Sequence, residues 1–238
     1  MKLVGIDGCR FGWVAVSLSD NCAFLFKNLN DLAKYYDDET LFLIDMPIGL
    51  PSENIDRKCE IMARKELSAK RKSSLFPVPC REAAYAETYE KASQINRKIL
   101  QKGISKQTWF ICSKIKELDE LLLQNQQLQS RFRESHPEVA FHFLNHKLSM
   151  EFNKKTEAGQ LERLKLLSQF SENIDVIYHN TIQKFKRKDV AKDDIIDALC
   201  LAVTLEEIVK NDISLESENK DDKNISMQIN FFDVLIFS

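Results

Sequence analysis

Short apolar runs alternate with turn-forming residues in the N-terminal part of the chain. The run 2–6 ends at an Asp-Gly pair, and the runs 12–18 and 22–26 follow after short polar breaks. Runs of this length, bounded by Gly, Asp and Asn, are typical of strands joined by tight connections. The pattern therefore predicts three consecutive strands in an antiparallel meander.

A fourth strand is predicted over residues 41–44, after a short helix over residues 31–36 that Asn30 would cap. Every residue of this strand is apolar, which indicates burial on both faces, as in a parallel pairing. The strand ends at Asp45, which precedes a Met-Pro pair. The order of three strands, a helix and a strand predicts an α/β fold with a mixed sheet.

Helical periodicity dominates the rest of the chain. Residues 53–130 are rich in Lys, Glu, Gln and Leu and are predicted to form a helical insertion. A short strand is predicted at 131–134, and an almost wholly apolar helix, opening with two acids, at 193–209. The other predicted helices cover residues 82–100, 106–127, 139–148 and 157–170, the last interrupted by Gly159.

The pattern divides the chain into three parts. Residues 1–210 form the predicted domain, and residues 211–226 are polar enough for a mobile linker. The tail, residues 227–238, is apolar again and would suit a strand added to a sheet edge, in the same chain or in a second molecule. A homodimer is therefore conceivable.

The composition favours a folded protein whose overall electrostatic field is weak. Hydrophobic residues make up 44% of the 238 residues, and 34 basic against 36 acidic residues leave a net charge of −2. Any nucleic-acid partner would have to be met by local basic patches. The longest apolar runs are far shorter than the roughly 18 residues that a membrane span needs, and the N-terminus does not resemble a signal peptide. We expect a cytoplasmic protein whose six scattered cysteines are reduced.

Acidic residues mark the places where strands end and where the apolar helix begins. Rigid strand ends can hold the hard oxygen ligands that a divalent ion such as Mg²⁺ requires. If the first and fourth strands are parallel neighbours, their terminal acids emerge side by side. The candidates are Asp7, Asp45, Glu134, Asp194 and Asp197.

Each of these acids also has a structural interpretation. Asp7 could simply form a turn with Gly8, and Asp45 could terminate its strand. Glu134 could be a surface acid, and Asp194 could cap its helix. Asp197 differs because it lies among apolar residues, where an unpaired charge would be costly, so it requires a partner.

Five sequence blocks resemble an uncharacterised bacterial and archaeal family of predicted RNase H-like nucleases, over about residues 1–210. The blocks are residues 5–13 (GIDGCRFGW), 44–51 (IDMPIGLP), 73–83 (SSLFPVPCREA), 134–138 (ESHPE) and 194–199 (DIIDAL). The resemblance implies an RNase H-like fold, with a mixed five-stranded sheet flanked by helices. It also implies phosphodiester hydrolysis at two Mg²⁺ or Mn²⁺ ions, which the five candidate acids would hold.

The same resemblance suggests roles for three further residues. His136, two residues after Glu134, would shuttle a proton or contact the scissile phosphate. Arg10 and Arg81 lie inside the matching blocks and would contact substrate phosphate, although Arg10 could instead pair with an acid.

Two dense basic stretches could follow a nucleic-acid backbone, or could be solvated helix faces. One includes Arg71 and Lys72, and the other covers residues 184–188. His142 and His146 are spaced for a transition metal, with Glu138 one turn earlier, but no further ligand accompanies them, which favours ordinary helix histidines. The substrate class, whether DNA, RNA, hybrid or branched, is left open.

Two other functions compete with the nuclease. Actin-like sugar and acyl kinases share the RNase H-like core, and the Asp-Gly-containing first hairpin is partly compatible with ATP binding, but such kinases generally duplicate the fold over two domains. A non-catalytic binding domain would also preserve the fold. Retained ATP would favour the first, and a bound ion without turnover the second.

Overall fold

The computed structural model describes residues 1–215 and 217–237, and within them five strands form one mixed sheet of order β3-β2-β1-β4-β5. β1 and β2 are antiparallel, as are β2 and β3, whereas β4 is parallel to both β1 and β5. This confirms the predicted α/β fold and mixed sheet, and the strand order is compatible with an RNase H-like fold. The strands are β1 (Leu3–Gly8), β2 (Trp13–Ser17), β3 (Cys22–Phe26), β4 (Leu41–Ile44) and β5 (Phe132–Glu134).

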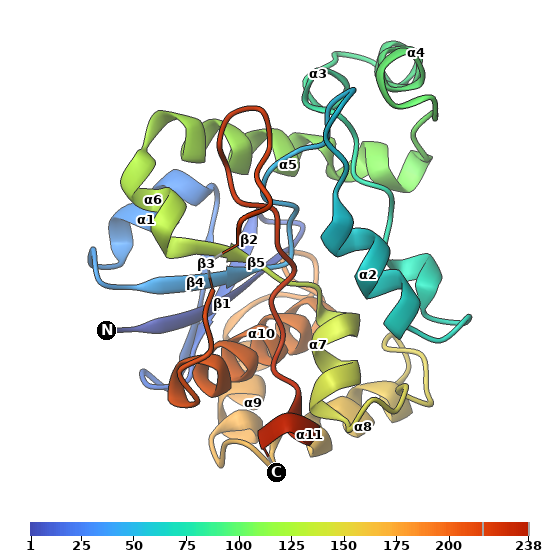
Figure 1. Ribbon diagram of the computed structural model, residues 1–238. Coiled ribbons are helices and arrows are strands. Elements are labelled where there is room, and N and C mark those ends of the chain that lie inside the picture. The colour runs from blue at the N-terminus through green and yellow to red at the C-terminus, as the bar shows by residue number, and fades with distance from the viewer. Residues whose placement is uncertain (216, 238) are drawn as a thin grey trace.

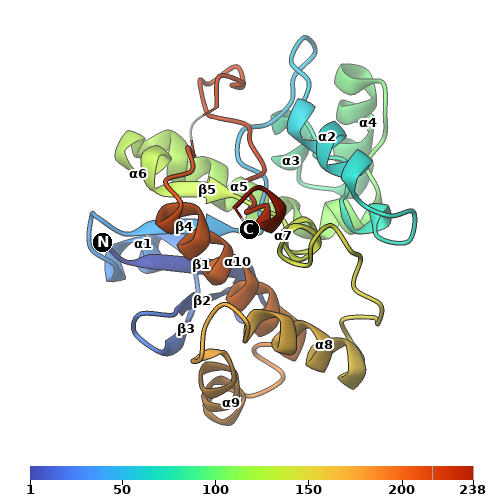
Figure 2. The ribbon, with the colours of Figure 1, turned by 60° about the horizontal axis from the view of Figure 1, so that its bottom comes forward.

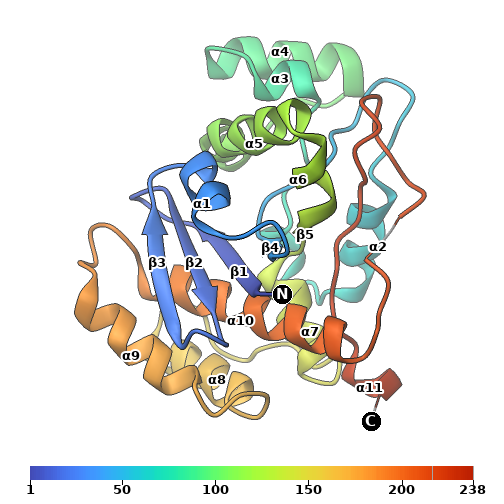
Figure 3. The same cartoon turned by 90° about the vertical axis from the view of Figure 1, so that its left-hand side faces the viewer.

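Helices cover both faces of the sheet, as Figures 1 and 3 show. One face carries α1 (Leu29–Tyr35), α5 (Lys106–Gln124) and α6 (Gln126–Arg131). The opposite face carries α10 (Lys192–Lys210), on which α7 (Pro137–Leu144), α8 (Glu157–Leu167) and α9 (Ile174–Lys184) pack. The predicted insertion begins with α2 (Lys58–Glu66), the 3₁₀ helix η1 (Lys72–Ser74), α3 (Arg81–Ala84) and α4 (Tyr89–Leu100).

Strand alternation assigns each residue of the central strands to one of these faces. Val4, Ile6 and Ile44 belong to the apolar core beneath α1 and α5. Leu43 and Val14 belong to the core beneath α10. Figure 2 shows α10 crossing the sheet on that second face. The strand residues that alternate with Val4, Ile6 and Ile44 therefore point toward α10.

Local capping divides some of the predicted helices. The helix expected over residues 82–100 is two helices, α3 and α4, because Thr88 caps a new start by accepting from the Lys91 N–H. Asn125 similarly separates α5 from α6. The helix near the N-terminus is capped by Asn28 rather than Asn30, since the Asn28 side chain accepts from the Asp31 N–H. The pattern did not indicate α9.

The C-terminal segment runs along the edge of the sheet beside β5, α2 and α7 (Figure 1). Asp221, in the segment expected to be a linker, is buried and accepts from the Leu50 N–H. In the tail, Ile229 bridges Glu134 in parallel fashion, and the Asn230 N–H donates to the Glu134 carbonyl. The chain then forms α11 (Val234–Phe237). Residues 216 and 238 of these predicted segments lie outside the described residues.

The six cysteines are free thiols. No helix in the described part of the chain combines the length and apolarity that crossing a membrane requires.

Candidate functional site

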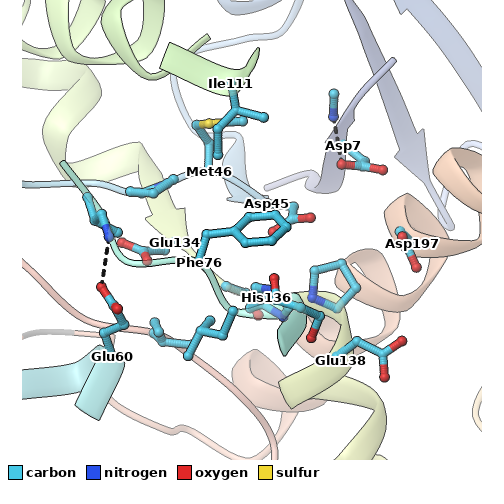
Figure 4. Close-up of a pocket in the computed structure, with 18 of the residues that line it drawn as sticks. Asp7, Asp45, Met46, Glu60, Phe76, Ile111, Glu134, His136, Glu138 and Asp197 are labelled. Carbon is cyan, nitrogen blue, oxygen red and sulfur yellow. Dashed lines mark hydrogen bonds between the residues drawn. The ribbon is translucent and has the colours of Figure 1, made fainter. Parts of the chain in front are cut away.

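Asp7 and Asp45 lie side by side at the carboxyl ends of β1 and β4. The Asp45 N–H donates to the Ile6 carbonyl at 3.0 Å, which continues the parallel pairing of the two strands beyond Ile44. Asp7 pairs with Val14, whose side chain lies in the core beneath α10, so the Asp7 carboxylate also points to the α10 face. Both carboxylates line a cavity of about 340 Å³, in which Figure 4 shows them.

Asp197 reaches the same cavity from the second turn of α10. Only 2% of its surface is exposed. The partner that its burial requires is Lys154, whose Nζ lies 2.6 Å from Asp197 Oδ2. Lys154 belongs to the loop of residues 145–156, between α7 and α8, and itself lines the cavity. The sequence indicated that Asp197 needs a counter-charge, but no pattern indicated which residue supplies it.

The carboxylates influence one another strongly. Burial, together with the charges of Asp45, Asp197 and Asp194, holds the pKa of Asp7 well above its usual range. Burial raises the pKa of Asp45 to about 7, although Lys154 opposes this shift. Burial also raises the pKa of Asp197, again against Lys154. A cation placed among these groups would favour their charged forms.

Glu134 lines the cavity from the opposite side (Figure 4). Because Glu134 pairs with Ile44, alternation turns its side chain away from the α10 face. Its carboxylate accepts from Arg57 Nη2 at 2.5 and 2.7 Å and from the Ile48 N–H at 2.7 Å. Burial raises the pKa of Glu134 to about 7, with Arg57 acting against it. Sequence reasoning did not identify Arg57 as this partner.

His136 and Ser135 follow Glu134 and also line the cavity. His136 Nε2 lies 3.3 Å from the Ser74 carbonyl, while His136 Nδ1 and Ser135 Oγ are buried without a hydrogen-bond partner among the described residues. Burial lowers the pKa of His136. The neutral ring therefore presents an unused nitrogen that can accept a proton or a hydrogen bond.

Asp194 and Arg10 lie in a neighbouring depression of about 650 Å³ rather than in the cavity. Asp194 accepts from the Ala191 N–H at 3.0 Å and so caps α10, as its structural interpretation proposed. Burial raises the pKa of Asp194 to about 6. The basic residues of this depression are Arg10, Lys155, Arg187, Lys188 and Lys192.

The other candidate cations are not among the residues that line the carboxylate cavity. Arg81 forms ion pairs with Asp119 at 2.8 Å, with Asp221 at 2.5 Å and with Asp222 at 2.6 Å. It therefore joins the insertion to the C-terminal segment. Arg71 donates to the carbonyls of residues 150 and 152, and Lys72 is exposed on η1.

The carboxylate oxygens that line the cavity are the type of ligand that a hard divalent ion such as Mg²⁺ prefers. Among the described residues, no three His, Cys, Asp or Glu side chains come close enough together to hold one ion. His142 and His146 do not form such a group either, because α7 ends at Leu144 and the two histidines therefore do not share a helix. Mg²⁺, however, is commonly bound by one or two carboxylates and completes its shell with water and phosphate. Asp7 and Asp45, adjacent and facing one cavity, meet that smaller requirement.

A family model described as "Protein of unknown function (DUF429)" matches residues 5–219. The chain belongs to this family. The match covers the sheet apart from Leu3 and Val4, all of α10, and every residue that lines the cavity except Ile229. Comparison with curated proteins and with solved structures found no match.

Proposed function

We propose that this DUF429 protein is a metal-dependent hydrolase that cleaves phosphodiester bonds of nucleic acid. The observation that carries the proposal is the set of three carboxylates, Asp7, Asp45 and Asp197, that β1, β4 and α10 direct into one cavity. Asp7 and Asp197 are buried, and Asp45 is partly buried. An RNase H-like strand order accompanies this set. Acids in this arrangement suit a hard divalent ion.

Asp7 and Asp45 would hold Mg²⁺ or Mn²⁺. A bound ion supplies positive charge to the phosphate and makes water a better nucleophile. Hydrolysis forms a bond between the water oxygen and phosphorus, breaks one phosphorus–oxygen ester bond, and requires a proton for the leaving oxygen. His136 lines the cavity and has an unpartnered Nδ1, so it is the residue there best suited to exchange a proton.

The basic depression beside α10 would bind the phosphate backbone on either side of the cleaved bond. Consecutive lysines connect the two places, since Lys154 lines the cavity and Lys155 lines the depression. Arg187 and Lys188 are exposed there, so they remain available to phosphate. A backbone contact of this type carries no base information, and the proposal therefore names nucleic acid without choosing DNA or RNA.

Cleavage of labelled single-stranded, double-stranded, hybrid and branched substrates with Mn²⁺ or Mg²⁺ tests the proposal. We expect cleavage that needs the ion and falls on the order of 100-fold or more in Asp7→Asn. Asp175→Asn, an exposed acid in the first turn of α9, is the matched control and should keep full activity. An Asp7→Asn variant as active as wild type would refute the assignment.

The two alternatives predict different outcomes in the same assay. A non-catalytic binding domain would take up the ion and nucleic acid without turnover. A phosphotransferase would consume ATP, but the described residues form a single sheet, whereas the actin-like kinases are expected to duplicate theirs.

A further inference from the structure

Lys154 places a fixed positive charge inside the carboxylate set. Its Nζ lies 2.6 Å from Asp197 Oδ2. Although burial lowers the pKa of Lys154, the charges of Asp197, Asp7 and Asp45 outweigh that effect and raise it, so the ammonium stays protonated. A cation of the protein itself therefore already lies among the carboxylates that a two-ion site would use.

The loop that carries Lys154 is tied down on both sides. Arg71 donates to the carbonyls of Met150 at 2.7 Å and Phe152 at 2.9 Å. Glu162 of α8 accepts from the N–H groups of Glu151 at 2.6 Å and Phe152 at 3.1 Å. These bonds fix the backbone immediately before Lys154, so the lysine is not carried by an untethered segment.

The first turn of α8 supports the loop from the other side. A Cβ placed on Gly159 would lie 2.0 Å from the Asn153 carbonyl oxygen and 3.2 Å from the Lys154 amide nitrogen. The absence of a side chain at Gly159 therefore lets the helix backbone pack directly against the loop. This explains the glycine that interrupts the predicted helix, and it fixes Lys154 relative to α8.

Charge balance indicates how many ions fit beside this lysine. The other acids that line the cavity have cationic partners of their own, since Glu134 pairs with Arg57, Glu138 with Arg163 and Glu60 with Arg64. Asp7, Asp45 and Asp197 then carry three negative charges when ionised, and Lys154 neutralises one of them. One divalent ion on Asp7 and Asp45 would neutralise the other two. A second divalent ion would leave an excess of positive charge and would have to displace Lys154 from Asp197.

We propose that Lys154 permanently takes the position of one of two cations, so that this protein binds a single divalent ion. This inference rests on the proposed function, because it assumes that Asp7 and Asp45 hold a catalytic ion. Lys154 is then a positioning residue: it holds Asp197 and supplies positive charge next to the ion without binding the ion itself.

Counting bound Mn²⁺ by calorimetry and electron paramagnetic resonance tests the inference without any substrate. We expect one ion on wild type, two on Lys154→Gln and one on Lys154→Arg, which keeps the charge. Lys165→Gln removes the same charge from an exposed position on α8 and should leave the count at one. Circular dichroism of each variant verifies folding.

The outcomes separate the inference from the proposed function. Two ions on wild type, or one ion on both wild type and folded Lys154→Gln, would overturn the inference and leave the proposed function intact. No ion on wild type, even with an oligonucleotide present to supply phosphate ligands, would overturn both.

A second measurement uses wild type alone. The rate at which an amine-labelling reagent modifies Lys154, followed by mass spectrometry, should be unchanged by saturating Mn²⁺. Faster labelling with Mn²⁺ would show that the ion expels Lys154, and would overturn the inference even if Lys154→Gln does not fold.

Discussion

Gly5 of β1 lies directly against Ala198 of α10. A Cβ at residue 5 would be 2.2 Å from the Ala198 carbonyl oxygen and 2.3 Å from the Ala202 amide nitrogen. The helix backbone therefore rests on the strand with no side chain between them. Since Asp197 precedes Ala198 and Asp7 is two residues beyond Gly5, this contact brings the carboxylates of α10 and β1 to the same cavity.

Gly5→Ala should destabilise the protein, because backbone atoms of α10 cannot move aside as a flexible side chain can. We expect a loss of about 1–3 kcal/mol or more in the free energy of unfolding, measured by urea denaturation. Gly8→Ala is the control on the same strand, since its Cβ would meet only the side chain of Lys114, at 3.0 Å. An equal loss in the two variants would contradict this account.

Gly159→Ala should displace the loop that carries Lys154. A methyl group 2.0 Å from the Asn153 carbonyl forces the loop away from α8, so we expect the number of bound Mn²⁺ ions to rise from one to two, as in Lys154→Gln. Ala158→Gly, an exposed neighbour in α8, should cost about 1 kcal/mol of stability through helix propensity and leave the ion count unchanged. A Gly159→Ala protein that still binds one ion would show that the close packing does not position Lys154.

The protonation of Asp45 should make the metal-free protein less stable as pH rises. Its pKa is raised to about 7 in the folded state by burial, so the folded protein keeps a proton that the unfolded chain releases near pH 4. Stability from this group is complete below pH 4 and is lost as pH rises to about 7.

Asp45→Asn removes this dependence. Relative to wild type, we expect the variant to gain on the order of 2 kcal/mol between pH 5 and pH 8, measured by urea denaturation without divalent ions. Glu90→Gln, an exposed acid on α4, should leave the wild-type profile unchanged. Parallel profiles for wild type and Asp45→Asn would contradict the prediction.

Arg57 and Glu134 should act as a structural pair rather than as part of the ion site. Arg57→Leu leaves the Glu134 carboxylate buried without its counter-charge, at an expected cost of about 3–5 kcal/mol in unfolding free energy. Adding Glu134→Leu should recover much of that loss, and the Mn²⁺ count should stay at one throughout. A lower count in the folded double variant would instead make Glu134 a metal ligand.

The basic depression should control affinity for nucleic acid and its dependence on salt. Arg187→Gln with Lys188→Gln removes two phosphate contacts and should reduce the slope of log K against log salt by roughly 1.4 to 1.8. Fluorescence anisotropy on the Asp7→Asn background measures binding without cleavage. The paired control is Arg97→Gln with Lys98→Gln, two exposed residues of α4. If the two double variants reduced the salt dependence of binding equally, the depression would not be part of the proposed binding surface.

The sequence determined the sheet and one edge of the candidate site, because both depend on local patterns. Short apolar runs bounded by turn-forming residues predicted β1 to β4, and β4 has the predicted bounds. Once β1 and β4 are parallel neighbours, their carboxyl ends must meet, so Asp7 and Asp45 were expected together and lie together. The apolar body of α10 likewise indicated that Asp197 is buried and needs a partner.

Tertiary structure decided which residues complete the site. Lys154 is 43 residues from Asp197, and Arg57 is 77 residues from Glu134, so no local periodicity links either pair. The face that Glu134 takes depends on a register in which it pairs with Ile44, and a shift of one residue would have turned it toward α10. A strand as short as β5 carries too few alternating positions to fix that register. Packing against β4 fixes it instead, and so places Glu134 beside Arg57. The packing of the 145–156 loop against α8 separately brings Lys154 to Asp197.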